Sequence, residues 1–189
     1  MPRVVGLLLA AGSGERFGGP KALARSAGEP WVVRAVRVLR DGGCDPVVVV
    51  VGAAADAVED LLDPATVVVR AEDWVTGMSA SLRAGLETVT TYDADAVLVH
   101  LVDLPDVGPA VVRRLVDVAS TDALARARYG DAPGHPVLLG RDHWAGAAAA
   151  ATGDRGARDH LAGRDVRHID CSDLANGEDV DEPGPMLGR

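Results

Sequence analysis

The chain has few aromatic residues and a deficit of basic charge. Aromatic residues make up 3% of the 189 residues, and the formal net charge at pH 7 is -9. Proteins that bind single-stranded nucleic acid stack the bases on aromatic side chains, and other nucleic-acid-binding proteins present a basic face. The composition therefore excludes a nucleic-acid partner. A small anion would have to be bound by a few local cations.

Cysteine and long apolar runs are also scarce. The two cysteines, Cys44 and Cys171, are far apart and show no metal-binding spacing, so two free thiols in a reducing compartment are expected. No apolar run reaches membrane-spanning length, and no secretory signal pattern precedes the first predicted strand. We therefore expect a cytoplasmic protein with no membrane partner.

The residues that are abundant predict one ordered α/β domain. The chain is 48% hydrophobic, and its valine-rich runs are apolar at every position, which is typical of parallel strands covered on both faces. We expect a single domain over residues 1–189, with its core at about 4–183 and a loose tail at 184–189. The expected strands span residues 4–9, 47–51, 66–69, 96–102, 123–129, 136–139 and 166–169. The expected helices span residues 30–40, 55–62, 79–88, 109–119 and 153–161, with an alanine-rich helix after residue 141.

The first predicted strand runs into a glycine-rich loop that carries two cations, Arg16 and Lys21. Glycine lets backbone N–H groups approach an anion closely, and nearby cations neutralise its charge, so the loop is predicted to bind phosphates. The dinucleotide pattern GxGxxG does not fit, because Phe17 stands at the third glycine position. The P-loop pattern does not fit either, because Ala22 follows the lysine.

The loop resembles the nucleotidyltransferase signature LAAGxGxRxGxPK, with one extra residue, Gly19, before the proline. This resemblance is to the MobA-like NTP transferase family, in which the loop wraps the triphosphate. It implies a single-domain, Rossmann-like nucleotidyltransferase fold with a mostly parallel mixed sheet and helices on both faces. It also implies that Arg16 and Lys21 are catalytic residues that stabilise charge on the phosphates. The nucleotide-binding positions implied in this loop are Leu9, Ala10, Ala11, Gly12, Gly14 and Lys21.

A second motif places Asp103 directly after a predicted strand, at the carboxyl edge where open α/β sheets bind ligands. A carboxylate at this edge can hold Mg²⁺, although an aspartate before Pro105 can also simply begin a turn. In the family an aspartate lies two residues before a proline, often with glutamine between them, where this chain has Leu104. The resemblance implies that Asp103 is a catalytic residue that binds the metal and the nucleotide.

A third motif, GMSASL, opens a predicted helix with Ser79 and Ser81 after Gly77. Serine at a helix start is an ordinary cap. The segment also resembles the family's GxSxSL turn beside the base and ribose, which implies nucleotide-binding roles for all three residues. A helix N-terminus offers N–H donors to such a ligand.

Two later motifs resemble one branch of the family, the molybdenum-cofactor cytidylyltransferases. His135 lies in GHP, and Asp154 and Arg158 lie in GDRGAR. A histidine in a turn is often structural, and Asp154 could cap the predicted helix that carries Arg158. The resemblance implies instead that the three residues line the acceptor side, with Arg158 on the acceptor phosphate.

The last motif is EDVDEP, in which Asp179 and Asp181 alternate along an extended segment and so point to the same side. The family usually reads DIDTPED here, and this chain has Glu182 in place of the threonine. An exposed acidic tail explains the two aspartates equally well. The resemblance implies that Asp181, with Asp179 behind it, completes the Mg²⁺ site of Asp103.

Together, the motifs predict a Mg²⁺-dependent nucleotidyltransferase that moves NMP from an NTP to a phosphate-bearing acceptor and releases pyrophosphate. The resemblance favours CTP and the molybdopterin form of the molybdenum cofactor, and it implies a downstream molybdoenzyme or its chaperone as a partner. Three alternatives stay open. They are a guanylyltransferase of the same pathway, an NAD(P)H-dependent oxidoreductase of a small heteroaromatic compound on the same fold, and a non-catalytic nucleotide-binding module.

Overall fold

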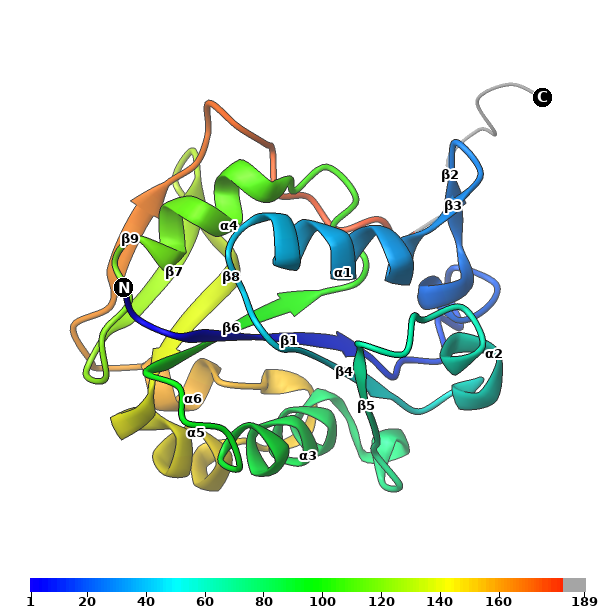
Figure 1. The fold of residues 1–189 in the computed structure, drawn as a ribbon, viewed down its shortest axis with the longest axis horizontal. Coiled ribbons are helices and arrows are strands. Elements are labelled where there is room, and N and C mark those ends of the chain that lie inside the picture. The colour runs from blue at the N-terminus through cyan, green and yellow to red at the C-terminus, as the bar shows by residue number, and fades with distance from the viewer. Residues whose placement is uncertain (182–189) are drawn as a thin grey trace.

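A seven-stranded sheet runs through the middle of the computed structural model, which describes residues 1–181 (Figure 1). The strand order is β5-β4-β1-β6-β8-β7-β9. The strands are β1 (Val4–Ala10), β4 (Val47–Val51), β5 (Val67–Arg70), β6 (Ala96–Leu101), β7 (Leu124–Tyr129), β8 (Ala132–Gly140) and β9 (Arg167–Asp170). Strand β8 is antiparallel to its neighbours β6 and β7, and the other pairs are parallel. The mostly parallel mixed sheet expected from the sequence is confirmed.

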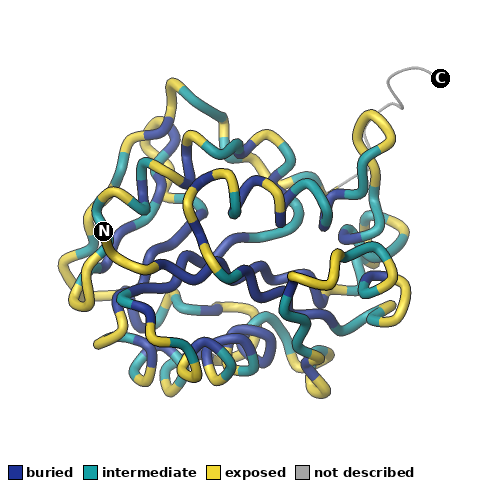
Figure 2. Tube along the Cα trace, in the orientation of Figure 1, coloured by how far each residue is buried: buried dark blue, intermediate teal, exposed yellow. Residues whose placement is uncertain are grey.

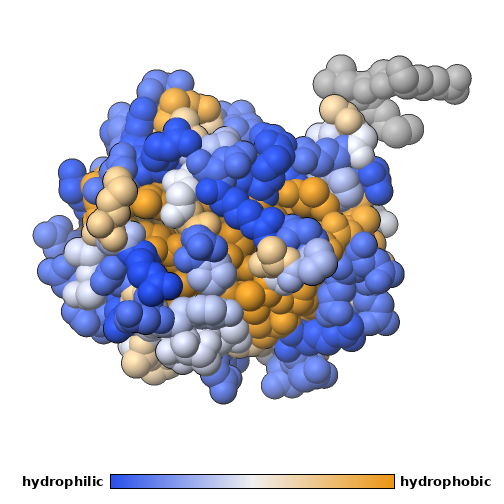
Figure 3. Space-filling view, in the orientation of Figure 1, coloured by the Kyte–Doolittle hydropathy of each residue, from blue (hydrophilic) through white to orange (hydrophobic). Residues whose placement is uncertain are grey.

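Helices cover both faces of this sheet, as expected (Figure 1). On one face lie α1 (Trp31–Asp41) and α4 (Pro109–Val116), and on the other lie α3 (Met78–Val89), α5 (Trp144–Ala150) and α6 (Arg158–Leu161). Every residue of β1 and β4 is buried, because side chains on both faces pack under helices (Figure 2). Each face has its own apolar core. In the space-filling view, apolar residues occupy the middle of the visible face and hydrophilic residues surround them (Figure 3).

The predicted helix over residues 153–161 is wrong. A 3-10 turn, η4 (Gly153–Arg155), comes first, and α6 then covers only Arg158–Leu161. Gly156 separates the two with a φ of +52°, a left-handed conformation that a continuous right-handed helix does not contain. The helix α2 (Ala55–Glu59) ends earlier than expected. A short hairpin of β2 (Arg25–Ser26) and β3 (Glu29–Pro30) was not predicted, and the expected tail at 184–189 lies outside the described residues.

The topology brings two of the predicted motifs together. Strands β1 and β6 are parallel neighbours, with Leu9 opposite Leu101. The strands β4 and β5, which follow β1, lie on one side of this pair in the sheet, and β8, β7 and β9, which follow β6, lie on the other side. Ligands bind open α/β sheets at such a switch point, beyond the carboxyl ends of the strands. The glycine loop after β1 and Asp103 after β6 therefore lie at the same edge. Among residues 1–181, no helix is both long and apolar enough to cross a bilayer.

A fully buried histidine, His100, lies in β6 three residues before Asp103. Burial, with the nearby charges of His135 and Arg34, lowers the pKa of His100 from 6.5 to about 3. Below pH 6.5 the unfolded chain therefore binds a proton at this position that the folded chain does not. The free energy of unfolding should fall as the pH drops through this range, by up to about 1.4 kcal/mol per pH unit from His100 alone.

Denaturant unfolding of His100→Gln between pH 7 and pH 4.5 tests this contribution. The variant should show a shallower pH dependence than the wild-type protein, whatever its absolute stability. His168→Gln, on the exposed strand β9, is the matched control and should keep the wild-type slope. An unchanged slope in His100→Gln would contradict the assigned pKa.

Candidate active site

A cavity of about 610 Å³ opens at the carboxyl edge of β1 and β6. This volume is in the range of small-molecule binding sites. Its walls come from the glycine loop, the end of β6, the start of α3 and the C-terminal segment. Of the predicted site residues, it is lined by Leu9, Ala10, Ala11, Gly12, Gly14, Arg16, Lys21, Gly77, Ser81, Asp103, Asp154 and Asp181. The cavity lining does not include Ser79, His135, Arg158 or Asp179.

The glycine loop is closed by its own backbone. Gly18 and Gly19 donate their N–H groups to the carbonyl oxygen of Gly14, at 2.9 and 3.1 Å. Gly14 has a φ of +62°, and a Cβ at this position would overlap the carbonyl oxygen of Gly19. Glycine is therefore required at position 14 for the loop to take this shape.

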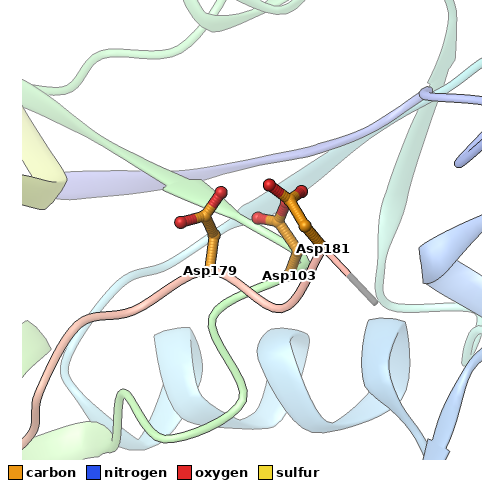
Figure 4. Close-up of side chains that lie close together, drawn as sticks. All are labelled: Asp103, Asp179 and Asp181. Atoms are coloured by element: carbon orange, nitrogen blue, oxygen red, sulfur yellow. The ribbon is translucent and has the colours of Figure 1, made fainter. Parts of the chain in front are cut away.

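Three carboxylates gather beside this loop. Oxygens of Asp103, Asp179 and Asp181 lie within 4.8 Å of one another (Figure 4). The C-terminal segment is held against the end of β6 because Val180 donates its N–H to the carbonyl oxygen of Asp103 at 3.1 Å. Asp179 and Asp181 therefore both turn their carboxylates toward Asp103, although Asp179 is not part of the cavity lining.

The C-terminal segment is anchored a second time by a residue that sequence reasoning missed. Asp106 accepts the backbone N–H groups of Asn176 and Gly177 at 2.8 and 3.1 Å. These bonds connect the turn after β6 to the segment that carries the other two aspartates. The sequence offered one indication of this role, because Asp106 lies only three residues after the predicted metal ligand Asp103.

Lys21 is the only lysine in the chain, and it bridges the loop and the acidic cluster. Its Nζ donates to Asp181 Oδ1 at 2.8 Å and to Asp103 Oδ2 at 3.0 Å. Burial alone would lower the pKa of Lys21, but the hydrogen bonds to the two aspartates raise it above its usual value. The hydrogen bond from Lys21 and its charge lower the pKa of Asp181. The lysine is therefore charged and partly neutralises the carboxylates.

The other oxygen of Asp103, Oδ1, is buried and has no hydrogen-bond partner among the described residues. A buried acceptor without a partner is unfavourable by about 1–3 kcal/mol. Carboxylate oxygens are the ligands that Mg²⁺ prefers in proteins. The clustered carboxylates and the unpartnered Oδ1 therefore fit a divalent cation.

The start of α3 is shaped by Asp154, although not in the way the sequence predicted. Asp154 Oδ1 accepts the backbone N–H of Met78 at 3.3 Å, so the aspartate caps α3 rather than its own helix. Gly77 precedes the helix with a φ of +114°, and a Cβ there would lie 2.6 Å from Asp154 Oδ1. The interpretation that a serine caps α3 is wrong. The helix begins at Met78, and the hydroxyl of Ser79 is buried without a partner in residues 1–181.

His135 and Arg158 are not part of the cavity lining. The hydroxyl of Tyr129 donates to the carbonyl oxygen of His135 at 2.8 Å. Burial, followed by the charges of Arg126 and Arg158, lowers the pKa of His135 to about 4, so its ring is neutral at neutral pH. Sequence reasoning also missed Trp74, which lines the cavity three residues before the GMSASL motif.

A ligand-sized cavity at a switch point, bordered by a glycine loop, a lysine and three carboxylates, is typical of α/β proteins that bind nucleotides. Comparison with known families identifies the group more closely. The MobA-like NTP transferase domain matches residues 6–170, and the chain belongs to this family.

Several known proteins are similar over most of the chain. One is the nicotine blue oxidoreductase of Paenarthrobacter nicotinovorans, which is 39% identical over 96% of this chain and 93% of its own length. The crystal structure of Rv0371c from Mycobacterium tuberculosis is 31% identical, covers 89% of this chain and 88% of that chain, and superposes with a TM-score of 0.78. A complex of Rv0371c with manganese is also known, at 32% identity, a TM-score of 0.74 and the same coverage of both chains. A probable molybdenum cofactor guanylyltransferase of Opitutus terrae is 34% identical over 57% of this chain and 51% of its own length.

Proposed function

We propose that this protein transfers the NMP group of an NTP, with CTP preferred, to a phosphate-bearing acceptor and releases pyrophosphate. One observation carries the proposal: Lys21 lies between Asp103 and Asp181, where the glycine loop meets the acidic cluster across one cavity. Membership of the MobA-like NTP transferase family supports the reaction class.

One set of residues would bind the nucleotide, and another would bind the metal. Backbone N–H groups of Gly12 and Gly14 would bind the triphosphate, and Arg16 and Lys21 would neutralise its charge. Asp103 and Asp181, with Asp179 behind them, would hold Mg²⁺, which supplies charge neutralisation to phosphate oxygens when bound. The manganese complex of the similar Rv0371c protein supports a divalent cation.

The remaining residues would place the reactants. Gly77, Ser79 and Ser81 lie at the start of α3, whose N–H groups can face the base and ribose. An oxygen of the acceptor phosphate attacks the α-phosphorus in line, the bond to the β-phosphate oxygen breaks, and pyrophosphate leaves. No covalent protein intermediate is needed, because positioning and charge neutralisation account for the step.

The acceptor would bind on the side of β8. His135, Asp154 and Arg158 resemble the acceptor residues of the molybdenum-cofactor branch, and the neutral ring of His135 can donate or accept a hydrogen bond there. We propose the molybdopterin form of the molybdenum cofactor as the acceptor, the cytoplasm as the compartment, and a molybdoenzyme or its chaperone as the recipient of the product.

A second candidate function has one specific observation in its favour. The nicotine blue oxidoreductase is similar over nearly the whole chain. An NAD(P)H-dependent reduction of a small heteroaromatic compound on this fold is therefore the alternative to test.

One experiment separates the two functions. The purified protein is incubated with Mg²⁺, the molybdenum cofactor and each of the four common NTPs in turn, and pyrophosphate is measured; a parallel series contains NADPH and nicotine blue. The transferase predicts pyrophosphate, with the highest rate for CTP, and no NADPH oxidation. NADPH oxidation without pyrophosphate would favour the alternative.

A further inference from the structure

Residues 176–181 belong to no helix or strand, yet they carry two of the three clustered carboxylates, Asp179 and Asp181 (Figure 4). Both aspartates are exposed, so packing of their own side chains does not hold them. A carboxylate on a loose segment binds a cation weakly, because binding must also order the segment. Tight binding therefore requires other contacts that hold the backbone of residues 176–181 in place.

Asp106, in the turn after β6, makes the first of these contacts. Its Oδ2 accepts the backbone N–H groups of Asn176 and Gly177, at 2.8 and 3.1 Å. Hydrogen bonds to an ionised acceptor are stronger than those to a neutral one. The side chain of Asn176 in turn accepts the N–H of Glu178 at 3.0 Å. One carboxylate therefore holds the turn that directly precedes Asp179.

Gly177 also packs against the ring of Tyr129, the last residue of β7. A Cβ at position 177 would overlap this ring, and Gly177 has a φ of +67°, which other residues adopt only with strain. The ring is buried, and its hydroxyl donates to the carbonyl oxygen of His135 at 2.8 Å. The turn is therefore held by Asp106 and also rests on a ring that is itself fixed.

A further hydrogen bond holds the segment beyond Asp179. Val180 donates its N–H to the carbonyl oxygen of Asp103 at 3.1 Å. The backbone is therefore fixed at positions 177 and 180, on either side of Asp179, and Asp181 directly follows the second contact. Both acceptors, Asp106 and Asp103, come from the short stretch of chain that follows β6.

We propose that Asp106 is a positioning residue that orders residues 176–181, so that Asp179 and Asp181 complete a divalent-cation site with Asp103. Asp106 is not one of the clustered carboxylates, and it acts through the backbone of the segment. The apparent dissociation constant of a site rises as the fraction of molecules in the binding conformation falls. The inference rests on the cation site of the proposed function.

Mn²⁺ binding, measured by electron paramagnetic resonance without nucleotide, tests this role. Asp106→Ala removes the acceptor for two N–H groups and should weaken Mn²⁺ binding at least about fivefold. Asp106→Asn removes the charge but keeps an oxygen that can accept both N–H groups, and it should stay within about twofold of the wild-type affinity. Asp95→Ala is the matched control. It loses an aspartate that accepts the N–H of Arg3 at 2.8 Å, and it should bind Mn²⁺ as the wild-type protein does.

Gly177→Ala tests the same segment without removing a polar side chain. The added Cβ would displace the turn from Tyr129, so this variant should also bind Mn²⁺ at least about fivefold more weakly. Amide hydrogen exchange in the metal-free protein shows whether the effect is local. In Asp106→Ala the amides of Asn176, Gly177 and Val180 should exchange faster, while the amides of β6 keep their wild-type rates.

Two results would overturn the positioning role. One is equal Mn²⁺ affinity in Asp106→Ala and the wild-type protein. The other is a loss in Asp106→Asn as large as that in Asp106→Ala, which would show that the charge of Asp106 acts on the cation rather than its hydrogen bonds.

Failure of this inference is distinguishable from failure of the proposed function. A wild-type protein that binds no Mn²⁺ would refute both the cation site and the role of Asp106. Mn²⁺ binding that depends on Asp106 as expected, without pyrophosphate release from any NTP, would refute the transferase reaction and support the positioning role. Pyrophosphate release with Mn²⁺ binding that ignores Asp106 would refute only the positioning role.

Discussion

Asp103→Asn is expected to reduce pyrophosphate release by at least about a thousandfold while the fold is kept. The asparagine oxygen can still accept the hydrogen bond that Lys21 donates at 3.0 Å, so the lysine keeps its position. Because the amide oxygen takes the place of Oδ2, an NH₂ group replaces Oδ1, the buried oxygen that has no partner among residues 1–181, and the variant loses both a negative charge and a metal ligand. A loss of this size is expected when a group stabilises charge mainly in the transition state.

The matched control for Asp103→Asn is Asp95→Asn. Asp95 directly precedes β6, at the opposite end of the strand from Asp103. Asp95 Oδ2 accepts the backbone N–H of Arg3 at 2.8 Å, and an amide oxygen can do the same. Rates are measured by coupled detection of pyrophosphate, and folding by circular dichroism. The control should keep its rate. A wild-type rate in Asp103→Asn would show that this carboxylate does not serve the reaction.

Lys21→Met is expected to change two measured quantities in opposite directions. The transfer rate should fall by about a hundredfold or more, because the variant removes a cation that would neutralise the triphosphate. The affinity for free Mn²⁺ should rise about tenfold, because Nζ now bonds Asp103 and Asp181 at 3.0 and 2.8 Å and competes with a cation for both. Mn²⁺ binding is measured by electron paramagnetic resonance without nucleotide.

Arg25→Met, four residues after Lys21 in the sequence, is the control for the removal of one positive charge. Arg25 lies in the β2–β3 hairpin and bonds the carbonyl oxygen of Gly28, so its loss should leave Mn²⁺ binding unchanged. The single lysine provides a second readout, because ¹³C-labelled lysine gives one side-chain signal, from Lys21. Mg²⁺ should shift this signal as Nζ leaves the carboxylates. Weaker Mn²⁺ binding in Lys21→Met would show that the lysine helps to bind the metal rather than competing for its ligands.

The parts of the site that follow strand order could be predicted from the sequence. Apolar runs without alternation indicated buried parallel strands, and parallel neighbours end at the same edge of a sheet. This geometry was enough to place the glycine loop beside Asp103. The alternation of Asp179 and Asp181 similarly predicted that both would point to one side, and their carboxylate oxygens lie within 4.8 Å of each other.

The parts that depend on long-range contacts could not be predicted in the same way. Asp154 caps a helix that begins 76 residues earlier, and no local pattern identifies such a partner. Gly156 interrupts a segment whose composition favours a helix, because its left-handed φ is set by packing rather than by propensity.

Transfer of label from CTP shows directly whether the protein moves a CMP group to the acceptor. The protein is incubated with Mg²⁺, molybdenum cofactor and CTP labelled at the α-phosphorus, and the nucleotide products are separated. The label should appear in a cytidine dinucleotide of the acceptor while unlabelled pyrophosphate is released in equal amount. Label that stays in CTP, with the other NTPs equally unused, would contradict it.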